Sequence, residues 1–370
     1  MSGDNVKLFI LEDDDKQGKI YLDAIADYYK KKSVEIVVEL SKNLEGGLEK
    51  LKTADYDAAI LDLKLAGDDT EGKGNKIIRE IKQKLRFPIF VVSGVLEELD
   101  ADLREQNIFY KVYNRTGKTA DELIDEIITI YNTGITKILG RKGKIEAALQ
   151  DIFWKHIAKN MDYWKSEIKN PEESERILLR HTLSYLSGYL EMDDAGTFLH
   201  FNPAEVYIIP PIIKNIFTGD ILKNKTDSKL YVVLTPACDF AQCKAKDVVV
   251  AFIEDRDMEC LAQQKIIFKK NDGTISVEQK KDAEEIIKKL LKNSHSHKYH
   301  FLPPTEQFRG GFINFQKISS IKLSEIPTSY DRIASITEKF MKDIIARFSN
   351  YYARQGQPDF NIDELFKKMV

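Results

Sequence analysis

Cysteine is scarce in this sequence: 370 residues contain three, Cys238, Cys243 and Cys260. Such an odd, sparse set argues against the disulfide framework of small secreted domains and favours a reducing compartment. Long hydrophobic runs are missing too, since no apolar stretch approaches the roughly 20 residues of a membrane-spanning helix. The start of the chain, residues 1–5, lacks the basic and then apolar layout of a signal peptide. We therefore expect a globular cytoplasmic protein without a membrane segment.

The sequence also lacks a strong excess of one charge. Its formal net charge is −3, and the acidic excess falls in residues 1–135. The small basic excess of the remainder is spread out, whereas DNA-binding domains usually present a concentrated basic face. We find no helix-turn-helix with a basic recognition helix. DNA binding is therefore the least favoured function, and a chain of this length is expected to form two or three domains.

The first third of the chain alternates between strand and helix patterns. Apolar runs favour strands, amphipathic stretches favour helices, and regular alternation of the two predicts a doubly wound parallel sheet of five strands. In such sheets a ligand site lies outside the carboxyl ends of the strands. The expected strands are 6–11, 34–38, 56–61, 89–92 and 108–113, and the expected helices are 16–32, 44–51, 73–84, 97–106 and 120–131.

Polar side chains follow several of these strands. Glu12 and Asp13 follow the first strand, Asp62 follows the third, and Ser93 follows the fourth. Carboxylates crowded at one sheet edge repel each other, so a cation or a phosphoryl group normally accompanies them. Mg²⁺ prefers oxygen ligands, and a carboxylate beside it can accept a phosphoryl group. The sequence therefore predicts a magnesium and phosphoryl site at this edge.

This constellation resembles the receiver domain of two-component response regulators, and the resemblance covers about the first third of the chain. It implies that Asp62 is the phosphoacceptor, that Glu12, Asp13 and Asp62 hold Mg²⁺, and that Ser93 is the switch hydroxyl. The lysine usual after the fifth strand is replaced. Arg115 fits the spacing from Ser93 best, and Lys118 is a substitute if the loop is longer. The position of the aromatic switch is Val112, and the loop 67–74 is longer than usual.

The resemblance implies a response regulator that accepts a phosphoryl group from a sensor histidine kinase and changes the surface formed by 97–106, 108–113 and 120–131. An unknown downstream protein would read that change. Two alternatives stay open. The receiver could be degenerate and act as a phosphate-independent interaction module, or it could control an enzyme built by the C-terminal region.

The rest of the chain has a different pattern of strand and helix signals. We expect a receiver at 1–133, then a linker (133–144) and helical segment within 134–197, and an α+β output domain with a β-rich core at 198–370. The helices 145–168 and 172–191 would form a hairpin or a homodimer contact. In the output domain the expected strands are 206–209, 230–234, 248–253, 265–268 and 312–315, and the expected helices are 277–291, 331–352 and a short one after 358.

Four weaker signals lie in this part, and each has a plain structural explanation that we prefer. Cys238 beside Asp239 could be a nucleophile, but a buried structural cysteine is commoner. The three cysteines could bind zinc, but no second short pair exists. His295, His297 and His300 could bind a metal, although loop histidines are commonly only exposed. The stretch Arg347–Arg354 could stack on a base or clamp a phosphate, but a packed aromatic face is commoner.

Overall fold

We describe the protein from a computed structural model, which covers residues 5–62, 73–94, 96–167, 170–189, 191, 196–197, 200–255, 259–271, 273–354 and 358–370. The chain divides into two compact units, Met1–Leu199 and His200–Val370. Most of the long loop expected at 67–74 lies outside the described residues.

Five parallel strands form the sheet of the first unit. They are β1 (Val6–Leu11), β2 (Ile36–Ser41), β3 (Ala58–Leu61), β4 (Ile89–Ser93) and β5 (Tyr110–Asn114). Their order is β2-β1-β3-β4-β5, and all neighbouring pairs are parallel. Every residue of β3 and β4 is buried, as expected for strands covered on both faces. This is the flavodoxin-like order of doubly wound sheets, and it confirms the predicted fold class.

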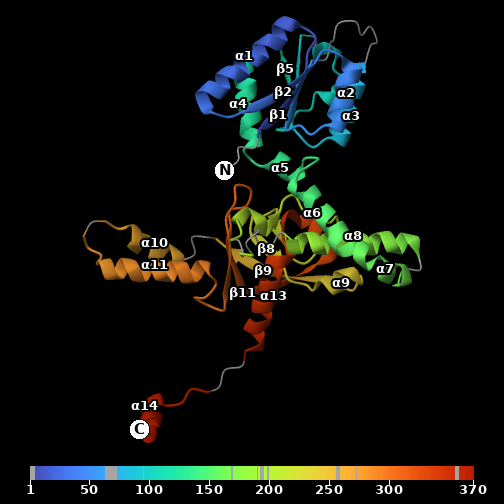
Figure 1. Ribbon diagram of the computed structural model, residues 1–370. Helices are drawn as coiled ribbons and strands as arrows, with labels where there is room; N and C mark the ends of the chain where they lie inside the picture. The colour runs from blue at the N-terminus through green and yellow to red at the C-terminus, as the bar shows by residue number, and fades with distance from the viewer. Residues whose placement is uncertain are drawn as a thin grey trace. The chain divides into compact units, whose positions relative to one another are not determined.

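Helices cover both faces of this sheet (Figure 1). Helices α1 (Asp15–Lys32) and α4 (Ala120–Tyr131) lie on one face, where Tyr21 and Ile124 pack against Leu8 and Ile60. Helices α2 (Leu44–Thr53) and α3 (Lys73–Lys84) lie on the other, with Leu51 and Ile78 in the second core cluster. The two cores fix the direction of the strands, and therefore the edge at which the strand-end acids meet.

The helix expected at 97–106 is replaced by two short 3₁₀ turns, η1 (Leu96–Glu98) and η2 (Ala101–Leu103). Arg79 of α3 pairs with Asp100 and Asp102, at 2.6 Å to each. Arg104 donates from Nε to the carbonyl of Leu99 at 2.9 Å, an acceptor that a continuous helix would use internally. The bond from Arg104 takes a carbonyl that a continuous helix would need, and the segment forms turns instead.

The expected linker at 133–144 contains a helix, α5 (Ile135–Leu139). Its Thr136 is buried and donates to Asp57 at 2.8 Å, beside the start of β3. A helical hairpin follows, as predicted. Its first arm comprises α6 (Lys144–Ile152), a π turn (Phe153–Ile157), a 3₁₀ turn (Ala158–Asn160) and α7 (Met161–Glu167), and its second arm is α8 (Pro171–Tyr189). Across the two arms, the rings of His156 and Tyr185 stack with centroids 4.8 Å apart.

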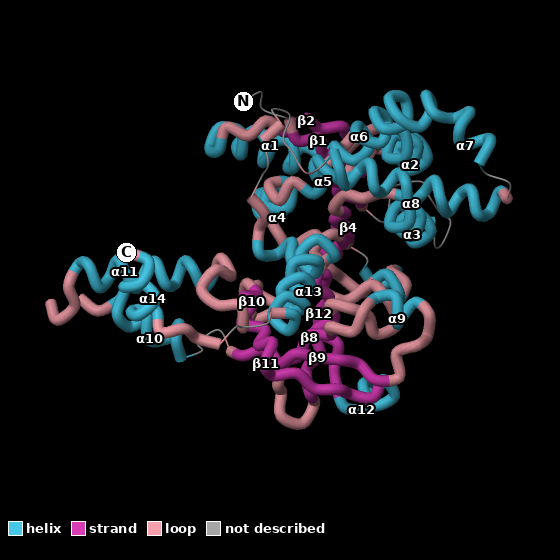
Figure 2. Tube along the Cα trace, turned by 90° about the horizontal axis from the view of Figure 1, so that it is seen from below, coloured by secondary structure: helices cyan, strands magenta, loops and turns pink. Residues whose placement is uncertain are grey.

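The second unit is built on a seven-stranded sheet. The pairings that link its strands are antiparallel, in the order β10-β11-β9-β8-β7-β12-β6, and the expected α+β unit with a β-rich core is confirmed. Figure 2 shows helix α13 (Glu338–Ala353) over these strands, where Ile344 and Tyr351 join the core. The strands are β6 (Tyr207–Ile208), β7 (Asp220–Asn224), β8 (Leu230–Val233), β9 (Asp247–Glu254), β10 (Tyr299–Leu302), β11 (Gly311–Lys322) and β12 (Tyr330–Ile336).

Two predictions in this unit are wrong. The run 265–268 is helical, because it belongs to α10 (Glu259–Lys269), whose Leu261 packs with Leu290 of α11 (Val277–Leu291). The helix expected at 331–352 begins later, because Ala334 and Ile336 of β12 enter the core on alternate positions. The remaining short elements are η5 (Pro203–Val206), α9 (Ala237–Ala241), η6 (Leu323–Glu325), α12 (Ile326–Ser329) and α14 (Ile362–Met369).

Candidate functional site

Backbone pairing brings the two predicted carboxylate positions together. The N–H of Glu12 donates to Ser41 of β2 at 3.0 Å, and the N–H of Asp62 donates to Leu11 of β1 at 2.9 Å. These bonds continue the ladders one residue beyond the strands, so both acids leave the sheet at its carboxyl edge. Ligand atoms of Glu12, Asp13 and Asp62 all lie within 4.8 Å of one another, and the side chains of Glu12 and Asp62 are buried.

A guanidinium group bridges the two buried acids. Arg115 follows β5, and its backbone N–H donates to the carbonyl of Ser93 at 3.2 Å. Its Nη2 lies 2.5 Å from Oδ2 of Asp62 and 3.1 Å from Oε1 of Glu12. The positive charge offsets the repulsion between the carboxylates. Arg115 therefore holds the two buried acids together.

Burial makes ionisation of Glu12 costly. Desolvation is the largest influence and, together with the negative charge of Asp62, raises the pKa of Glu12 to about 7, although the N–H of Asp14 and the charge of Arg115 oppose it. Asp14 was not singled out in the sequence, yet its N–H donates to Oε1 of Glu12 at 3.1 Å and orients this carboxyl group. Its own side chain accepts from Lys16 and caps α1, which ties the helix start to the site.

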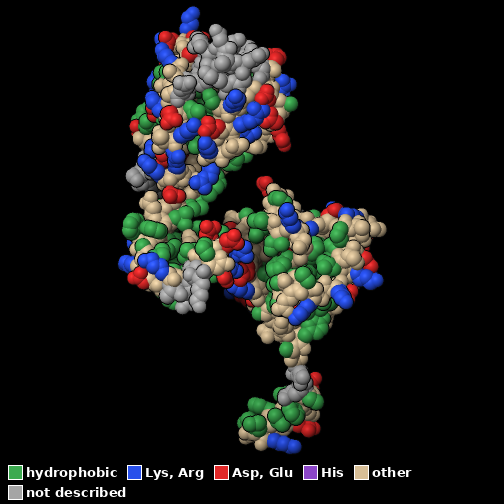
Figure 3. All heavy atoms as spheres, turned by 90° about the vertical axis from the view of Figure 1, so that its right-hand side faces the viewer, with side chains coloured by type: hydrophobic (Ala, Val, Ile, Leu, Met, Phe, Trp, Pro, Cys, Tyr) green, Lys and Arg blue, Asp and Glu red, His purple; other side chains and the backbone are tan. Residues whose placement is uncertain are grey.

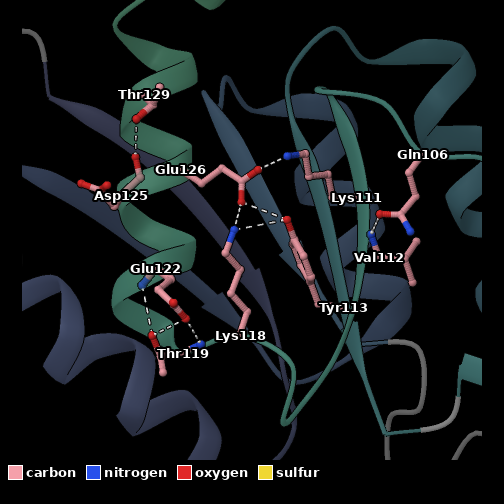
Figure 4. A network of polar contacts seen from close by, with 10 residues as sticks. All are labelled: Gln106, Lys111, Val112, Tyr113, Lys118, Thr119, Glu122, Asp125, Glu126 and Thr129. Carbon is pink, nitrogen blue, oxygen red and sulfur yellow. Dashed lines mark hydrogen bonds and ion pairs between the residues drawn. The ribbon is translucent and has the colours of Figure 1, made fainter.

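Lys118, the other candidate for the usual lysine, lies in a different network (Figure 4). Its ammonium group contacts the carboxylate of Glu126 on α4, which also contacts Lys111 of β5. The hydroxyl of Tyr113 donates to Glu126 at 2.9 Å. The structure thus brings Arg115, and not Lys118, to Glu12 and Asp62. Ser93 is fully buried at the end of β4, next to β3 in the sheet.

Glu126 is expected to be a stabilising residue of the β5–α4 face. Burial works to raise the pKa of Glu126, but bonds from Lys111, Lys118 and Tyr113 outweigh it, and the pKa lies below its usual value. A lowered folded-state pKa gives stability that is present above the unfolded pKa, about 4.3, and lost as the pH falls through the folded pKa.

We therefore predict that Glu126→Gln lowers the free energy of unfolding by about 1–2 kcal/mol at pH 7. Urea denaturation would measure the loss, which should shrink below about pH 4. Glu105→Gln, at an exposed carboxylate, is the control. A loss of the same size at pH 3 and pH 7 would contradict the assignment.

The carboxylate cluster fits a divalent metal ion. Among the described side chains, Glu12, Asp13 and Asp62 form the group of three ligands close enough to share an ion. All of their ligand atoms are carboxylate oxygens, which suit Mg²⁺, whereas a zinc site would normally include sulfur or imidazole nitrogen. Asp13 is half-buried, so it leaves the cluster open to solvent on one side.

The weaker C-terminal signals do not converge in the described residues. Cys238 and Cys243 are exposed, so the preferred explanation of Cys238 as a buried structural cysteine is wrong. The side chain of Cys260 lies outside the described part of the chain. His295 and His297 are exposed, as the preferred explanation requires. That explanation is wrong for His300, which is buried on β10 and whose pKa is lowered to about 3 by desolvation.

The stretch Arg347–Arg354 has structural contacts. Arg347 donates to the carbonyls of Ser296 and Tyr299 at 3.2 and 3.1 Å. Tyr352 donates to Phe315 at 2.7 Å, and Arg354 lies over the ring of Tyr351. The preferred structural explanation fits these side chains.

A buried polar cluster in the second unit was missed by the sequence analysis. Asp220 accepts from Ser335 at 2.5 Å, from the N–H of Phe217 at 2.8 Å and from Arg332 at 3.3 Å. Burial raises the pKa of Asp220 despite these bonds. An acid directly before the apolar pair Ile221 and Leu222 was the available signal, because a carboxylate in an inward-facing strand position needs partners.

None of the helices in the described part of the chain combines the length and the apolar character that a membrane crossing requires. The chain matches no model of a known protein family. No curated protein matches it in sequence.

Receiver domains are among the solved structures to which this chain is similar. One, from a response regulator of Methylobacillus flagellatus, is 18% identical and covers 34% of this chain and 99% of its own, with a TM-score of 0.26. The signal receiver domain of an HD domain-containing protein from Pseudomonas fluorescens is 10% identical and covers 35% and 97%, with a TM-score of 0.28. A receiver from Methanospirillum hungatei is 16% identical and covers 35% and 100%, with a TM-score of 0.24.

These identities and TM-scores are low, so the strand order and the site geometry carry the assignment. The order β2-β1-β3-β4-β5, the helices on both faces and the acids at the carboxyl edge are all found in the first unit. The N-terminal third of the chain therefore has a receiver-like fold.

Proposed function

We propose that this protein is a response regulator whose Asp62 accepts a phosphoryl group from a sensor histidine kinase. One observation carries the proposal: Asp62 and Glu12 leave adjacent parallel strands and share the guanidinium group of Arg115, at 2.5 and 3.1 Å. A carboxylate so placed has a cation beside it and lies at the sheet edge where ligands bind. The oxygen of Asp62 would attack phosphorus as the bond to the donor nitrogen breaks.

Glu12, Asp13 and Asp62 would hold Mg²⁺. When bound, the ion supplies positive charge that offsets the negative charge of the phosphoryl oxygens. Arg115 would leave Glu12 and pair with the phosphoryl group, because a guanidinium fork matches phosphate geometry. The hydroxyl of Ser93 would turn toward the same group and donate to it.

The change would spread through β5. Arg115 follows this strand, and Lys111 and Tyr113 within it contact Glu126 of α4. A shift of Arg115 toward a phosphoryl group would pull on the end of β5 and alter the β5–α4 face. This face, together with the turns η1 and η2, would be what a downstream protein or the second unit reads.

A second candidate function is a phosphate-independent interaction module. It is favoured by the same bridge, since Arg115 already offsets the charges of Asp62 and Glu12 without a metal ion. In that case the receiver-like unit would keep one shape and serve as a docking surface.

Beryllofluoride, an anion shaped like a phosphoryl group, separates the two functions. If Asp62 accepts phosphoryl groups, beryllofluoride with Mg²⁺ should raise the melting temperature of the full chain by roughly 5–10 °C at saturation. Neither beryllofluoride alone nor Mg²⁺ alone should give the whole increase in melting temperature. An unchanged melting temperature with both present would favour the phosphate-independent module.

Binding of Mg²⁺ is expected to depend on pH. A carboxyl group with a raised pKa must lose its proton before it can bind a cation, and the pKa of Glu12 is raised to about 7. Affinity for Mg²⁺ should therefore increase by up to about tenfold per pH unit below that value and level off above it. Calorimetric titration between pH 5.5 and 8.5 would measure this. Glu12→Gln should flatten the profile, and an unaltered slope in that variant would exclude Glu12 as its cause.

A further inference from the structure

The second unit contains an apolar groove of ≈ 980 Å³ between α13 and the loop that contains Ile212 and Ile213. Its lining is mainly aliphatic and aromatic, and α13 contributes Met341, Ile345 and Phe348. On the opposite wall, Ile212 and Ile213 are 79% and 51% exposed. Large aliphatic side chains exposed in a groove of this size mark a binding site for an apolar partner.

The same chain ends in a helix with an uncovered apolar face. Helix α14 carries Ile362, Leu365, Phe366 and Met369, and each of them is between 44% and 80% exposed. Their spacing, i, i+3, i+4 and i+7, is the anchor pattern of helices that bind in grooves. Figure 3 shows these hydrophobic side chains gathered on the helix at the end of the chain. A helix of this length is marginal alone in water, so it needs a surface to pack on.

We propose that the groove beside α13 is a binding site for an amphipathic helix and that its occupant is the chain's own α14. The dimensions agree. Groove residues on α13 run from Glu338 to Ser349, about 16 Å, and α14 is about 12 Å long. The segment 354–361 can span up to about 26 Å, which is enough for α14 to turn back along α13. The two helices would form an antiparallel hairpin.

Docked in this way, α14 would close the groove to other helices. A partner with the same spacing of apolar residues would have to displace it, so α14 would act as an internal competitor. This inference does not depend on phosphoryl acceptance at Asp62, and its test uses neither Mg²⁺ nor a phosphodonor.

Hydrogen exchange on the full chain tests the proposal. Backbone amides of 363–370 should exchange at least about tenfold more slowly in the wild type than in Ile212→Asp or Phe366→Asp, which place a charge on the groove wall or on the docking face. Both positions are exposed, so the fold should survive. Ile266→Asp is the matched control, because Ile266 is 66% exposed on α10, outside the groove. It should leave the exchange rate unchanged.

Equal and fast exchange of α14 in the wild type and both groove variants would overturn the proposal. Protection that rises with protein concentration would also overturn it, because the groove would then hold the helix of a second copy.

Discussion

Asp62→Asn is expected to abolish phosphoryl acceptance completely. An amide keeps the size of the side chain but has neither the negative charge nor the nucleophilic oxygen needed to form an acyl phosphate. After incubation with acetyl phosphate and Mg²⁺, the wild type should gain the mass of one phosphoryl group, and the variant should gain none. Asp23→Asn, at an exposed acid on α1, should behave like the wild type.

The Asp62→Asn variant should remain folded, so unfolding would not explain a missing phosphoryl gain. Replacing Asp62 removes one of two buried carboxylates that repel each other, and Arg115 keeps Glu12 as a partner at 3.1 Å. Melting of the variant should therefore stay close to that of the wild type. A phosphoryl gain that persists in Asp62→Asn would show that another residue is the acceptor.

Arg115→Ala should have the second largest effect, and the size of that effect should depend on Mg²⁺. Without the guanidinium group, two buried carboxylates face each other with no cation between them. We expect a loss of about 2 kcal/mol in the free energy of unfolding at pH 8, less than the roughly 3–5 kcal/mol of a fully buried pair because Arg115 is 33% exposed. Mg²⁺ should restore much of the loss, since it binds the same oxygens.

The pH dependence of this loss follows from Glu12. The pKa of Glu12 is raised, so its ionisation destabilises the folded state as the pH rises from the unfolded value toward about 7. Removing Arg115 takes away a charge that lowers this pKa, so the loss should be larger at pH 8 than at pH 5. Arg115→Lys keeps the charge and should recover most of the stability. A loss that is the same at both pH values would contradict the proposed bridge.

The sequence predicted the doubly wound parallel sheet and the acidic edge because both depend on short-range patterns. Apolar runs ending in acids mark buried strands, and the parallel order places those ends together. Glu12, Asp13 and Asp62 follow from this rule alone. The choice between Arg115 and Lys118 could not be predicted from this rule, because both residues lie in one loop. The fold decides it, since Glu126 of α4 attracts Lys118 away from the acids.

The second unit was harder to predict because its local patterns are ambiguous. The run Ile266 to Phe268 is apolar and partly β-branched, yet it is helical because α10 packs on α11. Strand β7 begins with a buried acid and β10 holds a buried histidine, so neither matched an apolar strand pattern. The partner of Asp220, Ser335, lies far away in sequence. Short-range patterns therefore could not identify these strands.

The intact mass of the wild-type chain tests the central claim most directly. The chain would be incubated with acetyl phosphate in the presence of Mg²⁺ and, separately, with a chelator. Phosphoryl acceptance at the Glu12, Asp13 and Asp62 cluster predicts a gain of one phosphoryl group with Mg²⁺ and none with the chelator. No gain in either sample, or the same gain in both, would contradict it.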